Sequence, residues 1–168
     1  MRAGLPRIGI GFDVHRFTGQ RRLVLGGVVI PHEAGLAGHS DADVLTHAIM
    51  DALLGAAGLP DIGQHFPPGA PEYQDISSIV LLARVREIVE AAGWRIGNVD
   101  AALQAERPIL APYIPQMKRC LALALGIDRA AIGIKASTTE GLGYVGRQEG
   151  IAAYAVALLA PTDPQQVS

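Results

Sequence analysis

The first thirty residues alternate between apolar and small or polar positions, a pattern typical of β-strands. In the segment RIGIGFDVH, residues 7–15, isoleucine, phenylalanine and valine alternate with glycine, aspartate and histidine. A strand here carries an apolar face and a small, polar face, and Asp13 and His15 point to the same side. The next segment, RLVLGGVVIP, has two β-branched runs around Gly26 and Gly27, which predicts a hairpin. The chain is therefore expected to open with a meander of strands.

Helical spacing follows from Ser40 to about Gly58, where apolar residues recur at successive turns. Ser40 is expected to cap this helix, with Asp41 and Asp43 in its positively polarised first turn. Two further helices are predicted over 76–92 and 112–125, each ending at a glycine. The segment 58–71 is rich in glycine and proline and long for a connector, which indicates a functional loop.

Strands are predicted over 95–105 and 132–137, and the last segment, GIAAYAVALL at 150–159, is ambiguous. Its alanines favour a helix, whereas its alternation and the glycine before it favour a strand, which is the interpretation adopted here. The order of elements predicts an α+β fold, with a mixed β-sheet and helices packed on one face. We expect a single domain over 1–160 and a disordered tail over 161–168.

The composition and charge argue against several classes of binding partner and cellular location. The chain has 168 residues, is 49% hydrophobic and carries a formal net charge of -2, so it has no broad positive field for nucleic acid or an anionic membrane. Its single cysteine, Cys120, cannot form an internal disulfide. The N-terminus enters a strand pattern without the regions of a signal peptide, and the apolar runs are too short to span a bilayer. We expect a cytoplasmic protein.

A candidate metal site emerges from two segments. Asp13 and His15 can both reach a metal on one side of their strand, and the helical motif HSDADVLTH brings Asp43 and His47 to one side, four residues apart. One aspartate and two histidines leave a fourth position open, which is the arrangement of a catalytic zinc site. The alternative is that these are ordinary polar residues of a strand end and a helix face.

Two segments are candidates for binding phosphate. The start of the first helix, with His39 and Ser40, offers the unpaired N–H groups that attract anions, unless Ser40 acts only as a cap. The segment KASTTEGLGYVGRQEG joins a strand to a glycine-rich turn and suits phosphate and magnesium, although a segment of this kind, taken alone, is more often a hairpin turn. Its hydroxyl and carboxylate ligands are Ser137, Thr138, Thr139 and Glu140.

The motifs GFDVH, HSDADVLTHAIMDALLGA, LPDIGQHFP, GNVD, IPQM and KASTTEGLGYVGRQEGIA occur in this order over nearly the whole chain. Together they resemble the 2-C-methyl-D-erythritol 2,4-cyclodiphosphate synthase family. The resemblance implies one zinc per subunit on Asp13, His15 and His47, and magnesium or manganese with the substrate diphosphate on Glu140. It further implies catalytic roles for His39 and Thr138. The implied substrate-binding residues are Ser40, Asp61, Ile62, Gly63, Ala105, Ile109, Leu110, Ala111, Ala136, Ser137, Thr139, Tyr144 and Arg147.

The sequence departs from the family pattern at four positions. Ala42 stands where glycine is usual, Pro68 where an aspartate is common, Ile109 where a lysine is expected and Tyr113 where a histidine is expected. The last three put the loop and nucleotide contacts in doubt, while the metal set is unchanged.

The resemblance also implies a homotrimer with active sites between neighbouring subunits. A cavity on its threefold axis can hold an isoprenoid diphosphate, with Arg147 and Glu149 facing inward and Tyr144 on the wall; otherwise Arg147 is a surface residue of a turn. The implied reaction belongs to non-mevalonate isoprenoid synthesis. The 2-phosphate of 4-diphosphocytidyl-2-C-methyl-D-erythritol 2-phosphate attacks the β-phosphorus and expels CMP, closing a cyclic diphosphate. Two alternatives are a zinc phosphohydrolase and a trimeric small-molecule binding protein.

Overall fold

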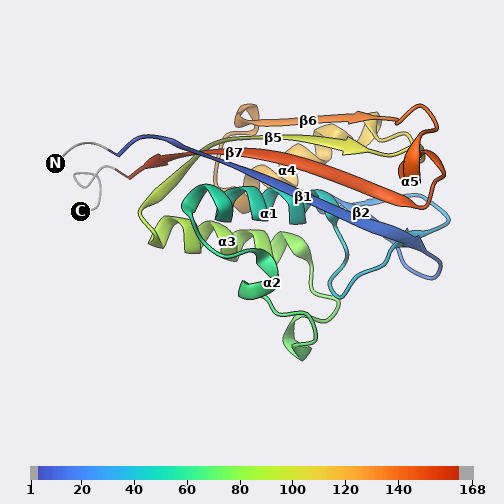
Figure 1. Cartoon of the computed structure of the whole chain (residues 1–168), viewed down its shortest axis with the longest axis horizontal. Coiled ribbons are helices and arrows are strands. Elements are labelled where there is room, and N and C mark those ends of the chain that lie inside the picture. Colours follow the sequence, from blue (N-terminus) through green and yellow to red (C-terminus); the bar gives the residue numbers. More distant parts are fainter. Residues whose placement is uncertain (1–3, 163–168) are drawn as a thin grey trace.

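The computed structural model describes residues 4–162, and within them a five-stranded sheet has the order β4-β1-β7-β5-β6 (Figure 1). The strands are β1 (Arg7–Thr18), β2 (Leu23–Leu25), β3 (Val28–Ile30), β4 (Gly35–Leu36), β5 (Trp94–Gln104), β6 (Ile132–Ser137) and β7 (Gly150–Pro161). The helices are α1 (Val44–Ala57), α2 (Ile62–His65), α3 (Ser78–Ala91), α4 (Ile114–Leu125) and α5 (Gly143–Gly146). Short 3-10 turns are η1 (Pro71–Tyr73), η2 (Ala111–Tyr113) and η3 (Arg129–Ala131).

The sheet is mixed, as the sequence predicts. Strand β7 pairs antiparallel with both β1 and β5, whereas β5 pairs parallel with β6. Parallel neighbours need a long crossover, and α4 lies in the connection between β5 and β6. The ambiguous last segment is the strand β7, at the centre of the sheet. The predicted hairpin is β2–β3, whose two-residue turn has positive φ at Gly26 and Gly27.

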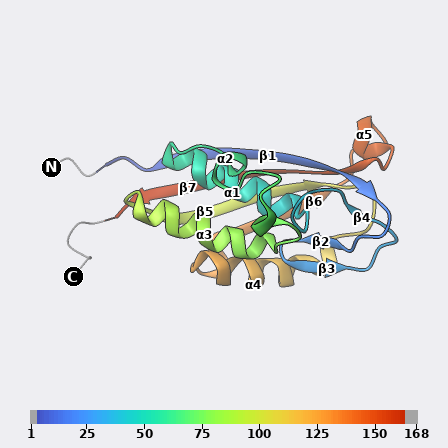
Figure 2. The same cartoon turned by 90° about the horizontal axis from the view of Figure 1, so that it is seen from below.

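Helices α1, α3 and α4 lie on one face of the sheet (Figure 2). Strand β1 rests directly on the backbone of α1, because a Cβ atom on Gly9 would lie 2.0 Å from the Ala52 carbonyl oxygen. The small, polar face of β1 therefore faces the helices. Its apolar face points away from them, and Ile8 and Ile10 are 73% and 72% exposed.

The first helix begins later than the sequence predicts. Its N-cap is Asp43 and not Ser40, so the expected capping role of Ser40 is wrong. The Asp43 carboxylate accepts hydrogen bonds from the backbone N–H of Thr46 (3.0 Å) and from those of Gly26 (2.9 Å) and Gly27 (2.7 Å). This carboxylate thus joins the hairpin turn to α1, which makes it unavailable to a metal and leaves the Ser40 side chain free for other contacts.

The C-terminal end of the predicted domain also differs from the expectation. The tail was expected from residue 161, but Pro161 ends β7 and the backbone N–H of Thr162 donates to the Gly93 carbonyl at 3.0 Å. Residues 163–168 of the predicted tail lie outside the described residues. Between 4 and 162, none of the helices has the length and apolarity needed to cross a membrane.

Candidate active site

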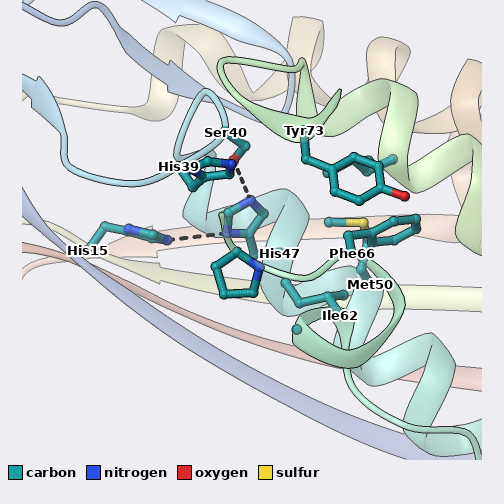
Figure 3. A pocket seen from close by; sticks show the side chains of 11 residues that line it. His15, His39, Ser40, His47, Met50, Ile62, Phe66 and Tyr73 are labelled. Atoms are coloured by element: carbon teal, nitrogen blue, oxygen red, sulfur yellow. Dashed lines mark hydrogen bonds between the residues drawn. The ribbon is translucent and has the colours of Figure 1, made fainter. Parts of the chain in front are cut away.

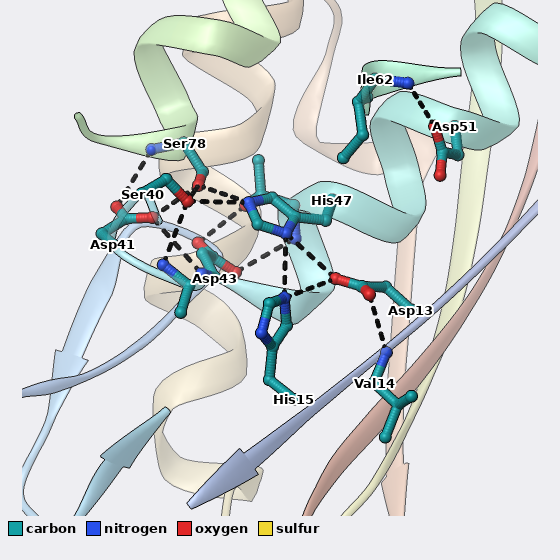
Figure 4. A network of polar contacts seen from close by, with 12 residues as sticks. Asp13, Val14, His15, Ser40, Asp41, Asp43, His47, Asp51, Ile62 and Ser78 are labelled. Carbon is teal, nitrogen blue, oxygen red and sulfur yellow. Dashed lines mark hydrogen bonds and ion pairs between the residues drawn. The ribbon is translucent and has the colours of Figure 1, made fainter. Parts of the chain in front are cut away.

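Three side chains from two elements converge on one point beside the N-terminal half of α1 (Figure 4). Asp13 and His15 come from the same side of β1, and His47 comes from the first turn of α1. Asp13 Oδ2 lies 2.9 Å from His15 Nε2 and 3.0 Å from His47 Nδ1, and the two ring nitrogens are 3.2 Å apart. One carboxylate and two imidazoles at this separation can hold a metal ion, and we call this group the metal triad.

The triad is electrostatically coupled. Burial alone would raise the pKa of Asp13, but hydrogen bonds from His15 and His47 outweigh burial and lower it far below its ordinary value. Burial likewise opposes protonation of His15, but the hydrogen bond and charge of Asp13 raise the pKa of His15 above its ordinary value. The half-buried Asp13 carboxylate thus favours positive charge beside it, which is the electrostatic setting that a cation needs.

In each histidine, the ring nitrogen that faces away from the shared point, here called the outer nitrogen, lies within hydrogen-bond distance of another group of the protein. His15 Nδ1 lies 2.5 Å from the Ala37 carbonyl oxygen, which can only accept a hydrogen bond. His47 Nε2 lies 3.1 Å from Ser40 Oγ and 3.0 Å from Ser78 Oγ. Donating the outer N–H directs the inner lone pairs, on His15 Nε2 and His47 Nδ1, toward the shared point.

A cavity of about 210 Å³, the histidine cavity, opens next to the triad (Figure 3). Its polar wall is made of His15, His39, Ser40 and His47, and Figure 3 shows Met50, Ile62, Phe66 and Tyr73 on the other side. Gly63, Pro68 and Leu81 complete the lining. The structure thus brings together a metal triad, a hydroxyl, a further imidazole and an apolar wall, which suits an anionic ligand with a small carbon skeleton.

The loop that carries this apolar wall is anchored on both sides. Asp61 caps the short helix α2, because its Oδ1 accepts from the Gln64 backbone N–H at 3.0 Å. The Asp51 carboxylate accepts from the Ile62 backbone N–H at 2.9 Å and ties the loop to α1. Of the predicted substrate-binding residues in this loop, Ile62 and Gly63 line the histidine cavity, while the Asp61 side chain serves as a cap.

A second cavity of about 140 Å³, the loop cavity, lies between the end of β6 and the turn after β5. It gathers seven of the residues predicted from the sequence: Ala105, Ile109, Leu110, Ala111, Ala136, Ser137 and Thr138, together with Glu106 and Pro108. Glu140 stands next to it in a left-handed conformation, φ 55°, and its Oε1 accepts from Thr138 Oγ1 at 3.0 Å. Within the described chain the two cavities share no lining residue.

Glu106 organises the turn that follows the loop cavity. Its Oε1 accepts three hydrogen bonds, from the Thr139 backbone N–H (2.8 Å), the Thr139 hydroxyl (3.0 Å) and the Gly141 backbone N–H (3.2 Å). These bonds lower the pKa of Glu106. The single proton of the Thr139 hydroxyl is shared between Glu106 and the Leu142 carbonyl oxygen, which lies 2.7 Å away, so this predicted substrate residue is engaged within the turn.

Tyr144 and Arg147 lie outside both cavities. Tyr144 is on α5 and 38% exposed, and Arg147 forms an exposed ion pair with Glu149 at 2.7 Å. Of the residues that depart from the family pattern, Ala42 has φ 57°, a left-handed conformation that favours glycine. Tyr113 packs partly buried against the core.

The match to a family model covers residues 6–160 of the chain. The chain belongs to the YgbB family. It is 60% identical over 153 residues to the 2-C-methyl-D-erythritol 2,4-cyclodiphosphate synthase of Thermosynechococcus vestitus, a match that covers 91% of this chain and 95% of that protein. The corresponding enzyme of Syntrophomonas wolfei is 58% identical over 153 residues, 91% of this chain and 98% of that protein.

Solved structures give the same result. The bifunctional IspDF of Campylobacter jejuni superposes with a TM-score of 0.91 at 40% identity, over 95% of this chain and 43% of that longer chain. The IspF–CDP complex of Plasmodium falciparum superposes with a TM-score of 0.82 at 33% identity, over 94% of this chain and 97% of the other. This YgbB-family chain therefore has the cyclodiphosphate synthase fold, and the resemblance inferred from its motifs is confirmed.

Sequence reasoning placed Asp41 in the first turn of the helix, which is wrong because α1 begins at Val44, and it gave no role to Ser78 or Glu106. Ser78 reaches His47 from α3, 31 positions along the chain, and Glu106 reaches Thr139 across 33 positions. A serine in the run ISSI or a glutamate in AERP carries no local signal of such a contact. The pairing of β5 with β6 and the packing of α3 beside α1 create these contacts.

Proposed function

We propose that the chain converts 4-diphosphocytidyl-2-C-methyl-D-erythritol 2-phosphate to 2-C-methyl-D-erythritol 2,4-cyclodiphosphate and CMP, in non-mevalonate isoprenoid synthesis. The observation that carries the proposal is the Asp13–His15–His47 triad at the mouth of the histidine cavity. It occurs in a chain 60% identical to a protein named for this reaction. The remaining steps follow from what the two cavities can hold.

The triad suits zinc, one ion per subunit. Tetrahedral zinc with bonds of about 2.0–2.1 Å places neighbouring ligand atoms about 3.3 Å apart. The three donor atoms are 2.9, 3.0 and 3.2 Å apart, so they need to move apart by only about 0.1–0.4 Å to reach that geometry. Three ligands leave a fourth position for a substrate oxygen, and when bound the ion supplies Lewis acidity toward a phosphate.

The residues of the histidine cavity hold the attacking group. A phosphate nucleophile is already anionic, so the reaction needs positioning and charge neutralisation more than a strong base. The Ser40 hydroxyl and the His39 ring lie on the polar wall, where they bind the 2-phosphate. The apolar wall of Met50, Ile62 and Phe66 excludes water, which would otherwise attack the β-phosphorus and give a linear product.

The loop cavity is assigned to cytidine and its neighbouring phosphate. Most of its lining residues are small or apolar, so a base would be bound chiefly through backbone groups, whatever the side chain at Ile109. Thr138 contributes a hydroxyl to the phosphate, and Glu140 is the proposed ligand of magnesium or manganese on the diphosphate. The CDP complex of the Plasmodium falciparum relative supports a cytidine nucleotide as ligand.

A homotrimer is the proposed working form. The histidine cavity and the loop cavity share no lining residue within the described chain, which supports an arrangement in which one substrate bridges two neighbouring subunits. The uncovered apolar face of β1, with Ile8 and Ile10, provides a surface for association. On the axis of that trimer, Tyr144, Arg147 and Glu149 are the proposed contacts of an isoprenoid diphosphate.

The proposal is tested by metal removal and restoration. Protein stripped with a chelator and then reloaded with zinc is incubated with substrate and magnesium, and CMP release is followed by chromatography. We expect CMP release to require the metal and to proceed without inorganic phosphate. Release of inorganic phosphate would indicate a zinc phosphohydrolase, and tight binding without turnover would indicate a binding protein.

A further inference from the structure

Ser78 is a fully buried hydroxyl between an acidic side chain and the outer nitrogen of a proposed metal ligand (Figure 4). It is the first residue of α3. Its Oγ lies 2.5 Å from Asp41 Oδ1 and 3.0 Å from His47 Nε2, and its backbone N–H donates to Asp41 Oδ2 at 3.0 Å. Both carboxylate oxygens of Asp41 therefore accept hydrogen bonds from Ser78, while Ser78 contacts His47.

The direction of each hydrogen bond in this chain follows from chemistry. An ionised carboxylate can only accept, so the Ser78 hydroxyl donates to Asp41. The Ser78 oxygen then presents only lone pairs to His47, which must donate from Nε2–H. The proton of the neutral ring is thereby fixed on Nε2, and the lone pair is on Nδ1. That nitrogen is the atom 3.0 Å from Asp13 Oδ2 and 3.2 Å from His15 Nε2.

We propose that Asp41 and Ser78 are positioning residues that hold His47 in the tautomer and ring orientation required to bind the metal. The inference rests on the metal centre proposed above. Neither residue touches the triad's shared point. Their effect passes through the His47 ring, in the way that a hydrogen-bonded partner raises the affinity of a histidine ligand for its metal.

A matched control stands next to Ser78. Ser77 is the N-cap residue of α3, is exposed, and in the described structure makes no side-chain cap hydrogen bond. Ser77→Ala and Ser78→Ala remove the same hydroxyl from adjacent positions of one helix end, but only the second removes a partner of His47. The thermal unfolding of both metal-free variants reports any general damage to α3.

The experiment measures zinc affinity of the full chain by competition with a chelating dye. We expect Ser78→Ala to weaken zinc binding about 10- to 100-fold and Ser77→Ala to change it less than about twofold. Asp41→Asn should weaken it as well, since the amide cannot accept from both Ser78 donors. Because both residues act through the same hydrogen bond to His47, the double variant should lose no more zinc affinity than the weaker-binding of the two single variants.

Cobalt substitution gives a second readout that does not depend on activity. The visible absorption of tetrahedral cobalt in the wild-type chain should weaken or shift in Ser78→Ala and Asp41→Asn, and stay unchanged in Ser77→Ala. Wild-type zinc affinity retained in Ser78→Ala, or losses that add in the double variant, would overturn the positioning role alone. A wild-type chain that binds no zinc would overturn the metal centre and this inference together. If Ser78→Ala does not fold, the zinc affinity of Asp41→Asn tests the same positioning role, and wild-type affinity in that variant would overturn it.

Discussion

Gly11 lies where β1 crosses α1, and replacing it by alanine should separate the two elements that carry the metal triad. A Cβ atom at this position would lie 1.9 Å from the Ala48 carbonyl oxygen and 2.7 Å from the Ala52 nitrogen, and real Cβ contacts do not fall below 3.0 Å. Strand and helix must therefore move apart by at least about 1.1 Å, the difference between 3.0 and 1.9 Å. Both neighbours are backbone atoms of a helix, so rotation of a side chain cannot relieve the clash.

This displacement reaches the metal centre directly. Asp13 is two residues beyond Gly11 on β1, and His47 is the residue before Ala48 on α1. Sites of this kind tolerate only about 0.5 Å of misplacement, so we expect Gly11→Ala to lower zinc affinity and activity on the order of 100-fold. Overpacking should also cost about 1–3 kcal/mol, which lowers the melting temperature by roughly 2–12 °C for a domain of this size.

Gly55→Ala is the matched control. A Cβ at Gly55 would meet only the Ile10 carbonyl oxygen, at an ordinary 3.9 Å, in the interior of α1. Alanine is favoured there by about 0.5–1 kcal/mol, so this variant should keep its zinc and melt slightly higher than wild type. The assay is thermal unfolding of the metal-free proteins at equal concentration, with zinc per chain counted after dialysis. A Gly11→Ala protein with wild-type melting temperature and full zinc content would refute the reasoning.

Three further perturbations probe other parts of the account. Ile10→Lys places a charge on the uncovered face of β1, and light scattering should show loss of the trimer, whereas Val29→Lys, at a residue 51% exposed on β3, should leave assembly intact; a trimeric Ile10→Lys would count against this interface. His47→Ala should abolish zinc binding and reduce CMP release at least about 100-fold, with a far-ultraviolet spectrum like that of wild type; an active purified variant would contradict the metal role. Glu106→Ala should weaken CMP binding more than Glu106→Gln, because all three donors converge on one oxygen that an amide can supply. The pKa of Glu106 in the folded protein is lowered below its ordinary 4.5, so the stabilisation of the turn by this carboxylate is present above pH 4.5 and is lost as the pH falls through the folded pKa. Hydrogen exchange of the Thr139 and Gly141 amides, corrected for the pH dependence of intrinsic exchange, should show protection that follows this course. Loss of protection above pH 4.5 would contradict it.

Much of the fold follows from local patterns. Period-two alternation and the Gly26–Gly27 pair predict β1 and the β2–β3 hairpin, and the glycines at helix ends place the ends of α1 and α4. Local patterns also predicted the residues of the metal triad. Spacing along a strand places Asp13 beside His15, helical spacing offers His47 as a third ligand, and the family motifs select the same three residues.

Long-range contacts account for what the sequence could not reveal. Ser40 and Asp43 are both good caps, and the choice depends on the Gly26 and Gly27 amides, which only the folded hairpin brings to Asp43. Alternation defines two faces of β1 but cannot say which one the helices cover. The helices cover the glycine face, because only glycine allows the strand to rest on the backbone of α1.

The most direct test of the central claim is the identity of the phosphorus product. Zinc-loaded protein is incubated with 4-diphosphocytidyl-2-C-methyl-D-erythritol 2-phosphate and magnesium, and the reaction is followed by phosphorus NMR. The account predicts CMP and two coupled resonances of a cyclic diphosphate in equal amounts, with no inorganic phosphate. A linear 2,4-bisphosphate or free phosphate beside CMP would show that water, and not the 2-phosphate, attacks, and would contradict the proposed cyclisation.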